Sequence, residues 1–71
     1  MKKIKLELTM DEALLLQTCC EFTEQFIGGS NGKRHEQFVK DYTEGLANAD
    51  GLYWYADKMS FDIARLREKE K

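Results

Sequence analysis

One short segment with the periodicity of a β-strand, followed by a chain with helical periodicity, limits what this sequence can fold into. Residues 3–9 alternate strictly, so that Ile4, Leu6 and Leu8 point to one side and polar side chains point to the other. A lone strand would leave its backbone N–H and C=O groups unpaired and its apolar side uncovered. The simplest partner is the same strand of a second copy, so the segment predicts a homodimer paired through residues 3–9.

The size of the chain favours the same association. Seventy-one residues predict one small helical domain over residues 1–71. A chain of 8.3 kDa buries about 62% of its unfolded surface on folding. The free energy gained by that burial is comparable to the conformational entropy lost, at about 1.5 kcal/mol per residue. Contact with another subunit would supply the stability that the single chain lacks.

The charge and cysteine content exclude several classes of protein. The net charge of −2 argues against a general nucleic-acid binder, which is usually basic. The sequence has no apolar run long enough for a membrane-spanning helix and no secretory signal, so no membrane partner is expected. Cys19 and Cys20 are adjacent and cannot close an ordinary disulfide. Free thiols predict a cytoplasmic protein.

The first predicted helix spans residues 10–27. Thr9 is a favourable N-cap, and Glu12 three residues later completes a capping box. Gly28 and Gly29 are expected to end the helix in the left-handed conformation. Its apolar stripe, expected to face the core, consists of Leu15, Cys19, Phe22 and Phe26, widened by Leu16, Cys20 and Ile27.

Two more helices are predicted, over residues 33–46 and 51–69, with a turn at 48–51 between them. The apolar stripe of the second is His35, Phe38 or Val39, Tyr42 and Leu46; that of the third is Leu52, Tyr55 or Ala56, Met59, Ile63 and Leu66. The fold class is therefore mainly α, with an N-terminal strand followed by three helices. Residues 52–55 also have strand propensity. The alternative is an α+β monomer in which they pair with residues 3–8, but the helical periodicity favours a helix.

The glycine-containing loop between the first two helices is the candidate for anion binding. Glycines let backbone N–H groups approach an anion closely, and a helix N-terminus follows. Cations at that N-terminus are unfavourable unless an anion is bound. The spacing differs from that of a phosphate-binding Walker loop, and an ordinary solvated turn explains the same residues. The candidate residues are Gly28, Gly29, Gly32, Lys33, Arg34 and His35.

Metal binding and catalysis have weaker support. Asn48, Asp50, Gly51 and Asp57 match four positions of a calcium loop, but the first ligand position is occupied by Leu46. Adjacent cysteines on a helix point about 100° apart, which does not suit a zinc site. No metal, no cofactor and no catalytic residue is therefore predicted.

Three consecutive aromatic residues give the candidate protein-binding surface. Tyr53, Trp54 and Tyr55 cannot all face one core, because successive helical positions turn by about 100°. Exposed Trp and Tyr are common anchors of protein interfaces. Acidic residues of the middle segment, Asp50 and Asp57 among them, would border the contact. The expected function is that of a small non-enzymatic protein, of the regulator or inhibitor type, that binds another macromolecule.

The order of strand, helix, glycine-containing loop and helix over residues 3–46 resembles the ribbon-helix-helix DNA-binding proteins. That resemblance implies a dimeric ribbon entering the major groove, with Lys3 and Lys5 turned toward DNA. The acidic Glu7, the longer first helix and the extra third helix depart from the family's pattern. Two alternative functions remain: a dimeric DNA-binding regulator, and a binder of a small anionic ligand or nucleotide at the glycine loop.

Overall fold

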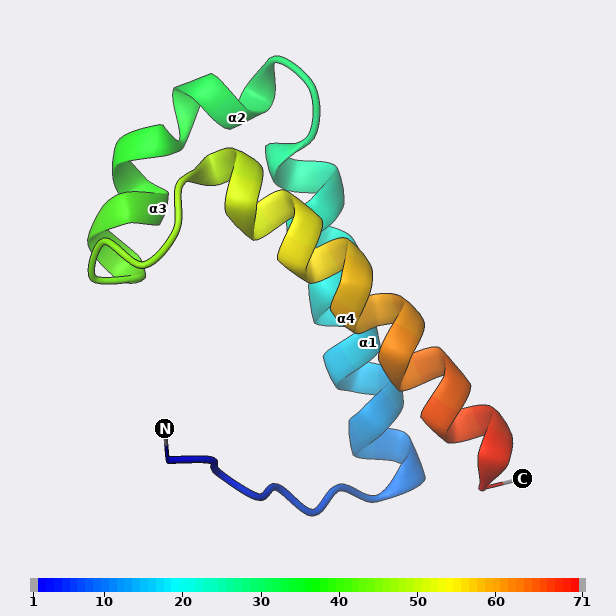
Figure 1. Ribbon diagram of the computed structural model, residues 1–71. Helices are drawn as coiled ribbons and strands as arrows, with labels where there is room; N and C mark the ends of the chain where they lie inside the picture. The colour runs from blue at the N-terminus through cyan, green and yellow to red at the C-terminus, as the bar shows by residue number, and fades with distance from the viewer. Residues whose placement is uncertain (1, 71) are drawn as a thin grey trace.

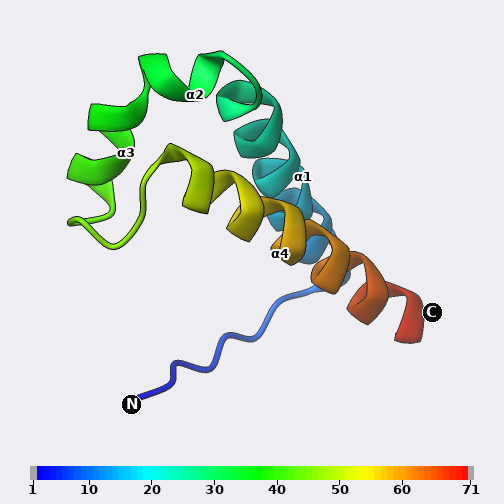
Figure 2. The ribbon, with the colours of Figure 1, turned by 45° about the horizontal axis from the view of Figure 1, so that its top comes forward.

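Two long antiparallel helices dominate the computed structural model, which describes residues 2–70. The helices are α1 (Met10–Ile27), α2 (Asn31–Arg34), α3 (Glu36–Tyr42) and α4 (Ala49–Lys69). Figures 1 and 2 show α1 and α4 side by side and running in opposite directions, with α2 and α3 joining them at one end. The mainly helical class predicted from the sequence is confirmed.

Helix α1 has the predicted bounds because its start is fixed locally. The Thr9 hydroxyl accepts a hydrogen bond from the Glu12 backbone N–H at 3.1 Å, and the Glu12 carboxylate accepts one from the Thr9 N–H at 3.0 Å. This reciprocal pair is the predicted capping box. The left-handed residue after the helix is Gly29 (φ 61°), whereas Gly28 is extended.

The predicted second helix over 33–46 is wrong in its bounds. The chain is helical from Asn31 to Arg34, breaks at His35 (φ −111°, ψ 10°) and is helical again only to Tyr42. The end of α3 has a clear cause. The Gly45 N–H donates to the Lys40 carbonyl at 2.8 Å, and the preceding residue, Glu44, adopts the left-handed conformation (φ 55°), as in the Schellman termination of a helix.

Helix α4 begins two residues before its predicted start. The Asn48 side chain accepts a hydrogen bond from the Gly51 N–H at 2.7 Å and caps the helix. Residues 49–51, predicted as part of a turn, therefore form its first turn. Residues 52–55 are helical, so the alternative in which they form a second strand is wrong.

No strand forms within residues 2–70. Because residues 52–55 are helical, the described chain offers no edge on which residues 3–9 can pair. The segment before α1 extends away from the helices (Figure 1), and the Ile4 side chain is 95% exposed. Pairing through residues 3–9 would need a second copy, and it remains a prediction.

The core is narrow because small residues line the contact between the long helices. Its buried residues are Ile27, Val39, Ala49, Ala56, Ser60 and Ile63. The contact reaches the last turn of α4, where the Arg67 guanidinium donates to the amide oxygen of Gln17 in the middle of α1 at 2.8 Å. Large side chains of the α1 stripe that was expected to face the core are instead exposed: Phe22 is 71% exposed and Phe26 is 58% exposed. The assignment was wrong for these aromatic residues, which do not pack between α1 and α4, whereas Ile27 of the same predicted stripe is buried.

Candidate binding surfaces

A hollow at the α2 end of the helix pair brings together parts of two predicted sites. It has a volume of about 460 Å³ and is lined by Ile27, Gly29, Gly32, Lys33, Glu36, Ala49, Asp50, Tyr53 and Trp54. The Trp54 side chain remains 62% exposed. Its ring lies edge-on to the Tyr53 ring, with the centroids 5.2 Å apart. A bulky aromatic side chain thus borders a hollow that also carries Lys33 and Asp50, and we call it the Trp54 hollow.

Two of the loop glycines have a packing role that is independent of any ligand. A Cβ atom at Gly28 would lie 2.9 Å from the Glu24 carbonyl oxygen and 3.4 Å from the Tyr53 ring. A Cβ atom at Gly32 would lie 2.9 Å from the Ile27 carbonyl oxygen. Glycine is therefore needed at both positions for close approach of the backbone.

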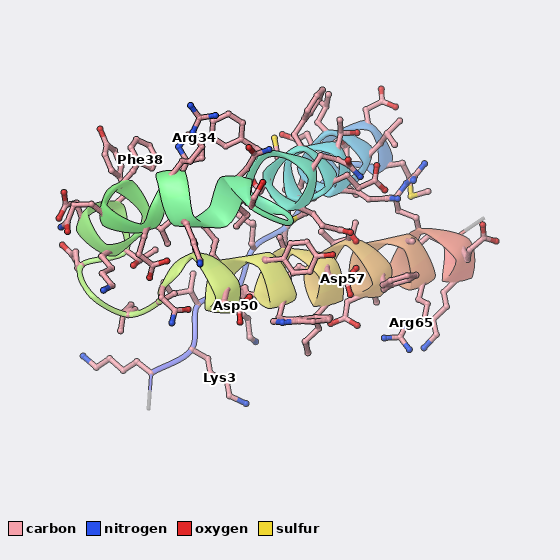
Figure 3. All side chains as sticks on the ribbon, turned by 90° about the horizontal axis from the view of Figure 1, so that it is seen from above. Lys3, Arg34, Phe38, Asp50, Asp57 and Arg65 are labelled. Atoms are coloured by element: carbon pink, nitrogen blue, oxygen red, sulfur yellow. The ribbon has the colours of Figure 1, made fainter. Side chains whose placement is uncertain are left out.

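The cations of the predicted anion site diverge. Lys33 lines the Trp54 hollow, whereas Arg34 lines a different hollow with Phe22, Phe26 and His35. Figure 3 shows Arg34 and Asp50 on opposite edges of the molecule. The His35 ring stacks on Phe26 at a centroid distance of 4.3 Å. The six predicted residues do not surround one point, and anion binding here stays a prediction.

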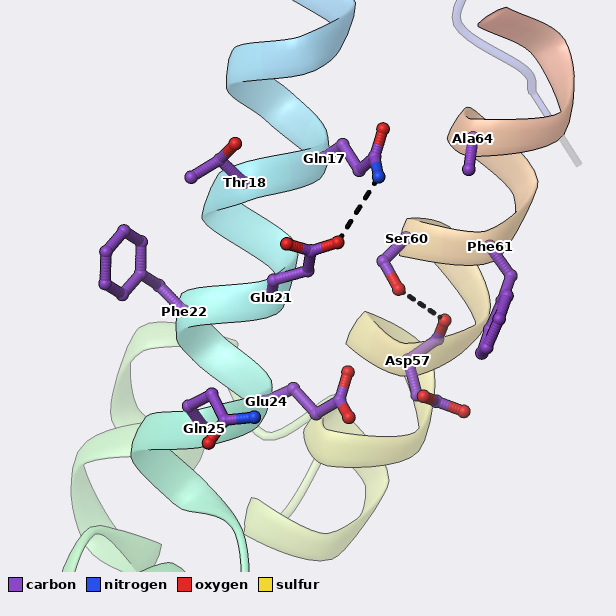
Figure 4. Close-up of a pocket in the computed structure, with 10 residues that line it drawn as sticks. All are labelled: Gln17, Thr18, Glu21, Phe22, Glu24, Gln25, Asp57, Ser60, Phe61 and Ala64. Atoms are coloured by element: carbon purple, nitrogen blue, oxygen red, sulfur yellow. Dashed lines mark hydrogen bonds between the residues drawn. The ribbon is translucent and has the colours of Figure 1, made fainter. Parts of the chain in front are cut away.

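The two predicted acidic contact residues also separate. Asp50 borders the Trp54 hollow, while Asp57 lies farther along α4 and borders a hollow of about 530 Å³ between α4 and α1 (Figures 3 and 4). Glu24 projects from α1 into the same hollow. Burial, and then the nearby carboxylate of Asp57, raises the pKa of the Glu24 carboxyl.

The residues that resembled a calcium loop serve the helix instead. The Asn48 oxygen is used to cap α4. Among residues 2–70, no three His, Cys, Asp or Glu side chains converge on a point where a metal ion could bind. Cys19 is exposed and Cys20 is half-buried. Burial, followed by the neighbouring Cys19 and Glu21, raises the pKa of the Cys20 thiol.

The predicted DNA-contacting residues Lys3 and Lys5 are exposed on the extended segment before α1. Figure 3 shows the Lys3 side chain pointing away from the helices. Nothing in the described chain fixes the direction of these side chains. Helices over residues 2–70 are all too short or too polar to cross a membrane.

An apolar surface centred on Leu52 was not recognised from the sequence. Two hollows adjoin at this residue: one of about 320 Å³ between α1, α3 and α4, and one of about 760 Å³ beyond α3. The large side chains around Leu52 are Phe22, Phe26, Phe38, Tyr42, Leu46 and Tyr55, and we call this surface the Leu52 face. Its sequence signal was the set of apolar stripes, which were all assigned to a core.

Comparison with models of protein families finds no match to this chain. Comparisons with curated proteins and with solved structures also find no similar protein.

Proposed function

We propose that this is a small non-enzymatic protein, of the regulator or inhibitor type, that acts by binding another macromolecule at the Trp54 hollow. The observation that supports this proposal is the exposure of Trp54, 62% of whose side chain remains open to solvent beside a hollow. An exposed indole next to a concavity is a common anchor in protein interfaces, where Trp, Tyr and Arg contribute most of the binding energy. A cytoplasmic location stays a prediction that rests on the free thiols.

The surroundings of Trp54 suit a protein partner. Tyr53 supports the indole from one edge, and Lys33 and Asp50 provide a charge of each sign at the rim. An apolar centre with a polar rim is the usual arrangement of a protein interface. Opposite charges at the rim would select the orientation of the partner and exclude partners with the wrong pattern.

Replacement of the indole tests this proposal. Trp54→Ala should weaken binding to a protein recovered with the wild-type chain by ~2 kcal/mol or more, measured by titration calorimetry. Phe61→Ala is the matched control, because Phe61 lies seven residues later on α4 and is similarly exposed, at 64%. Equal affinities of the two variants would contradict the proposal, and unfolding of Trp54→Ala alone would assign Trp54 to the fold.

A second candidate function is DNA binding by a homodimer paired through residues 3–9. The observation in its favour is the extended, unpartnered segment with exposed Lys3 and Lys5. Such a complex should lose affinity steeply with salt, and Lys3→Ala or Lys5→Ala should weaken binding to DNA in a mobility-shift assay. Affinity for DNA that is unchanged in both variants would exclude this candidate.

A further inference from the structure

We propose that a second copy of this chain covers the Leu52 face, so that the α1–α4 pairs of two copies form a four-helix assembly. This interface lies on other residues than the segment 3–9 and the Trp54 hollow. It is therefore independent of the proposed function and can fail separately from it.

The apolar surface continues from the Leu52 face along the helix pair. On α4, Leu52, Met59 and Leu66 repeat every seven residues, and the buried Ala56 and Ile63 fall between them. The spacing of four and three residues is that of a helix with a seam of apolar contacts to neighbouring helices. Only part of this seam is used within the chain, because Leu66 is 60% exposed while Ile63 is only 6% exposed.

Helix α1 carries a matching stripe beside it. Leu15, Phe22 and Phe26 recur at helical spacing and are 64%, 71% and 58% exposed, and Phe22 and Phe26 border the same hollow as Leu52. Two adjacent helices thus present apolar stripes on one side. A helical pair of this kind is half of a four-helix bundle, in which the remaining two helices cover the apolar side.

The exposed area favours a large partner surface. The chain exposes 6300 Å², whereas a compact chain of 8.3 kDa exposes about 4,600 Å². The extended segment and the exposed apolar side chains of the helices both contribute to this excess. A compact dimer of twice the mass exposes about 7,600 Å², so its formation would bury at most about 2,500 Å² per chain, the extended segment included. The total burial is that of obligate homodimers.

The charges around the face favour a copy of the same chain over a charged partner. Among the charged side chains of α4 between Leu52 and Leu66, Asp62 is paired with Lys58 at 2.8 Å and with Arg65. The two cations share this one carboxylate, so the group keeps a single net positive charge, which is too small to select a strongly acidic partner. A face that is apolar and nearly neutral can pair with itself across a two-fold axis, because each residue then meets a similar surface.

Charge substitutions on opposite sides of α4 test the proposal. Leu66→Glu places a charge on the proposed interface, and Phe61→Glu places the same charge on the other side of α4, where Phe61 is 64% exposed against 60% for Leu66. Sedimentation equilibrium between about 1 and 100 µM protein should show dimers for the wild type and for Phe61→Glu. The dissociation constant of Leu66→Glu should be at least about 100-fold higher, because a buried unpaired charge opposes association.

Three outcomes would overturn the proposal: a wild-type monomer at 100 µM, equal dissociation constants for the two variants, or a dimer lost in Leu6→Pro but kept in Leu66→Glu. The last would assign the dimer to the strand, which proline disrupts. If Leu66→Glu does not fold, the proposal is tested by how the melting temperature of the wild type depends on protein concentration. It should rise with protein concentration for a dimer, and a constant value would contradict the proposal.

Discussion

The two sides of the α1–α4 pair differ in the kind of side chain that they expose to solvent. On one side, the hollow between the helices is lined mainly by polar residues: Gln17, Thr18, Glu21, Glu24, Gln25, Asp57 and Ser60. On the other side lie Leu52 and the large apolar side chains of the Leu52 face. The polar groups of the first side can hydrogen-bond to water, although Phe22 and Phe61 also line its hollow, whereas the second side offers fewer such groups. The comparison shows that polar side chains concentrate on the first side and large apolar side chains on the second, with Phe22 bordering both.

The contact between the helices explains this division. Small residues such as Ala56 and Ser60 lie buried between α1 and α4, so the backbones approach closely. The large side chains are consequently placed on the flanks of the pair. The few buried apolar residues contribute only part of the stability of a domain, which makes the uncovered side a source of further stability on association.

The largest expected effect is on the free energy of unfolding, and it distinguishes the buried residues of the α4 seam from the exposed ones. Ile63→Ala should reduce the free energy of unfolding by about 3 kcal/mol, because Ile63 is only 6% exposed and a cavity would remain. Leu66→Ala, three residues later, should have an effect that depends on protein concentration, since its contacts are made by the second copy. Urea denaturation of both variants at two protein concentrations measures this. A Leu66→Ala effect that does not change with concentration would place Leu66 on a free surface.

A smaller effect is expected where α1 begins, at a site that belongs to neither side. Thr9→Ala should lower the free energy of unfolding by about 1 kcal/mol, because it removes the cap on the Glu12 N–H. Thr18→Ala is the control, since the Thr18 hydroxyl donates to the Leu14 carbonyl within the helix and caps nothing. Thermal unfolding followed by circular dichroism would contradict the capping role if the two variants were equally destabilised.

The smallest effect concerns the polar side, and it depends on pH. The pKa of Glu24 is raised in the folded chain by burial and by Asp57, so the folded state holds the proton at pH values where the unfolded state has lost it. This contribution should raise the free energy of unfolding as the pH falls through the folded pKa, until the unfolded carboxyl is protonated too. Glu24→Gln should therefore be slightly stabilising at pH 7, with the gain lost at acidic pH.

Urea denaturation of wild type and Glu24→Gln across this pH range measures the difference. Glu7→Gln is the control, because Glu7 is exposed on the segment before α1, away from this hollow. A Glu24→Gln variant that is destabilised at pH 7 would contradict the assigned cause of the shift.

The features predicted correctly from the sequence were those fixed by neighbouring residues. The capping box of Thr9 and Glu12 and the two following glycines were enough to bound α1. The break at His35 was missed, because the ring stacks on Phe26 in another helix and that contact has no local pattern. Periodicity located the apolar stripes but did not identify what covers them.

The candidate sites were less predictable for the same reason. Lys33 and Trp54 are 21 positions apart, and they share a hollow only because α2 lies against the start of α4. Lys33 and Arg34 are adjacent and were predicted to belong to one anion site. Because successive helical residues point in different directions, the two side chains line different hollows. Spacing along the chain predicts local geometry, whereas these sites depend on contacts between helices.

The most direct test of whether a second copy covers the Leu52 face is an isotope-filtered NOE measurement on a mixed sample. Half of the protein is labelled with ¹³C and half is unlabelled, so that only contacts between copies give signals. A second copy on this face predicts intermolecular NOEs to the methyl groups of Met59 and Leu66, with none to the Trp54 ring. Intermolecular NOEs confined to residues 3–9 or to Trp54, or none at all at millimolar concentration, would contradict it.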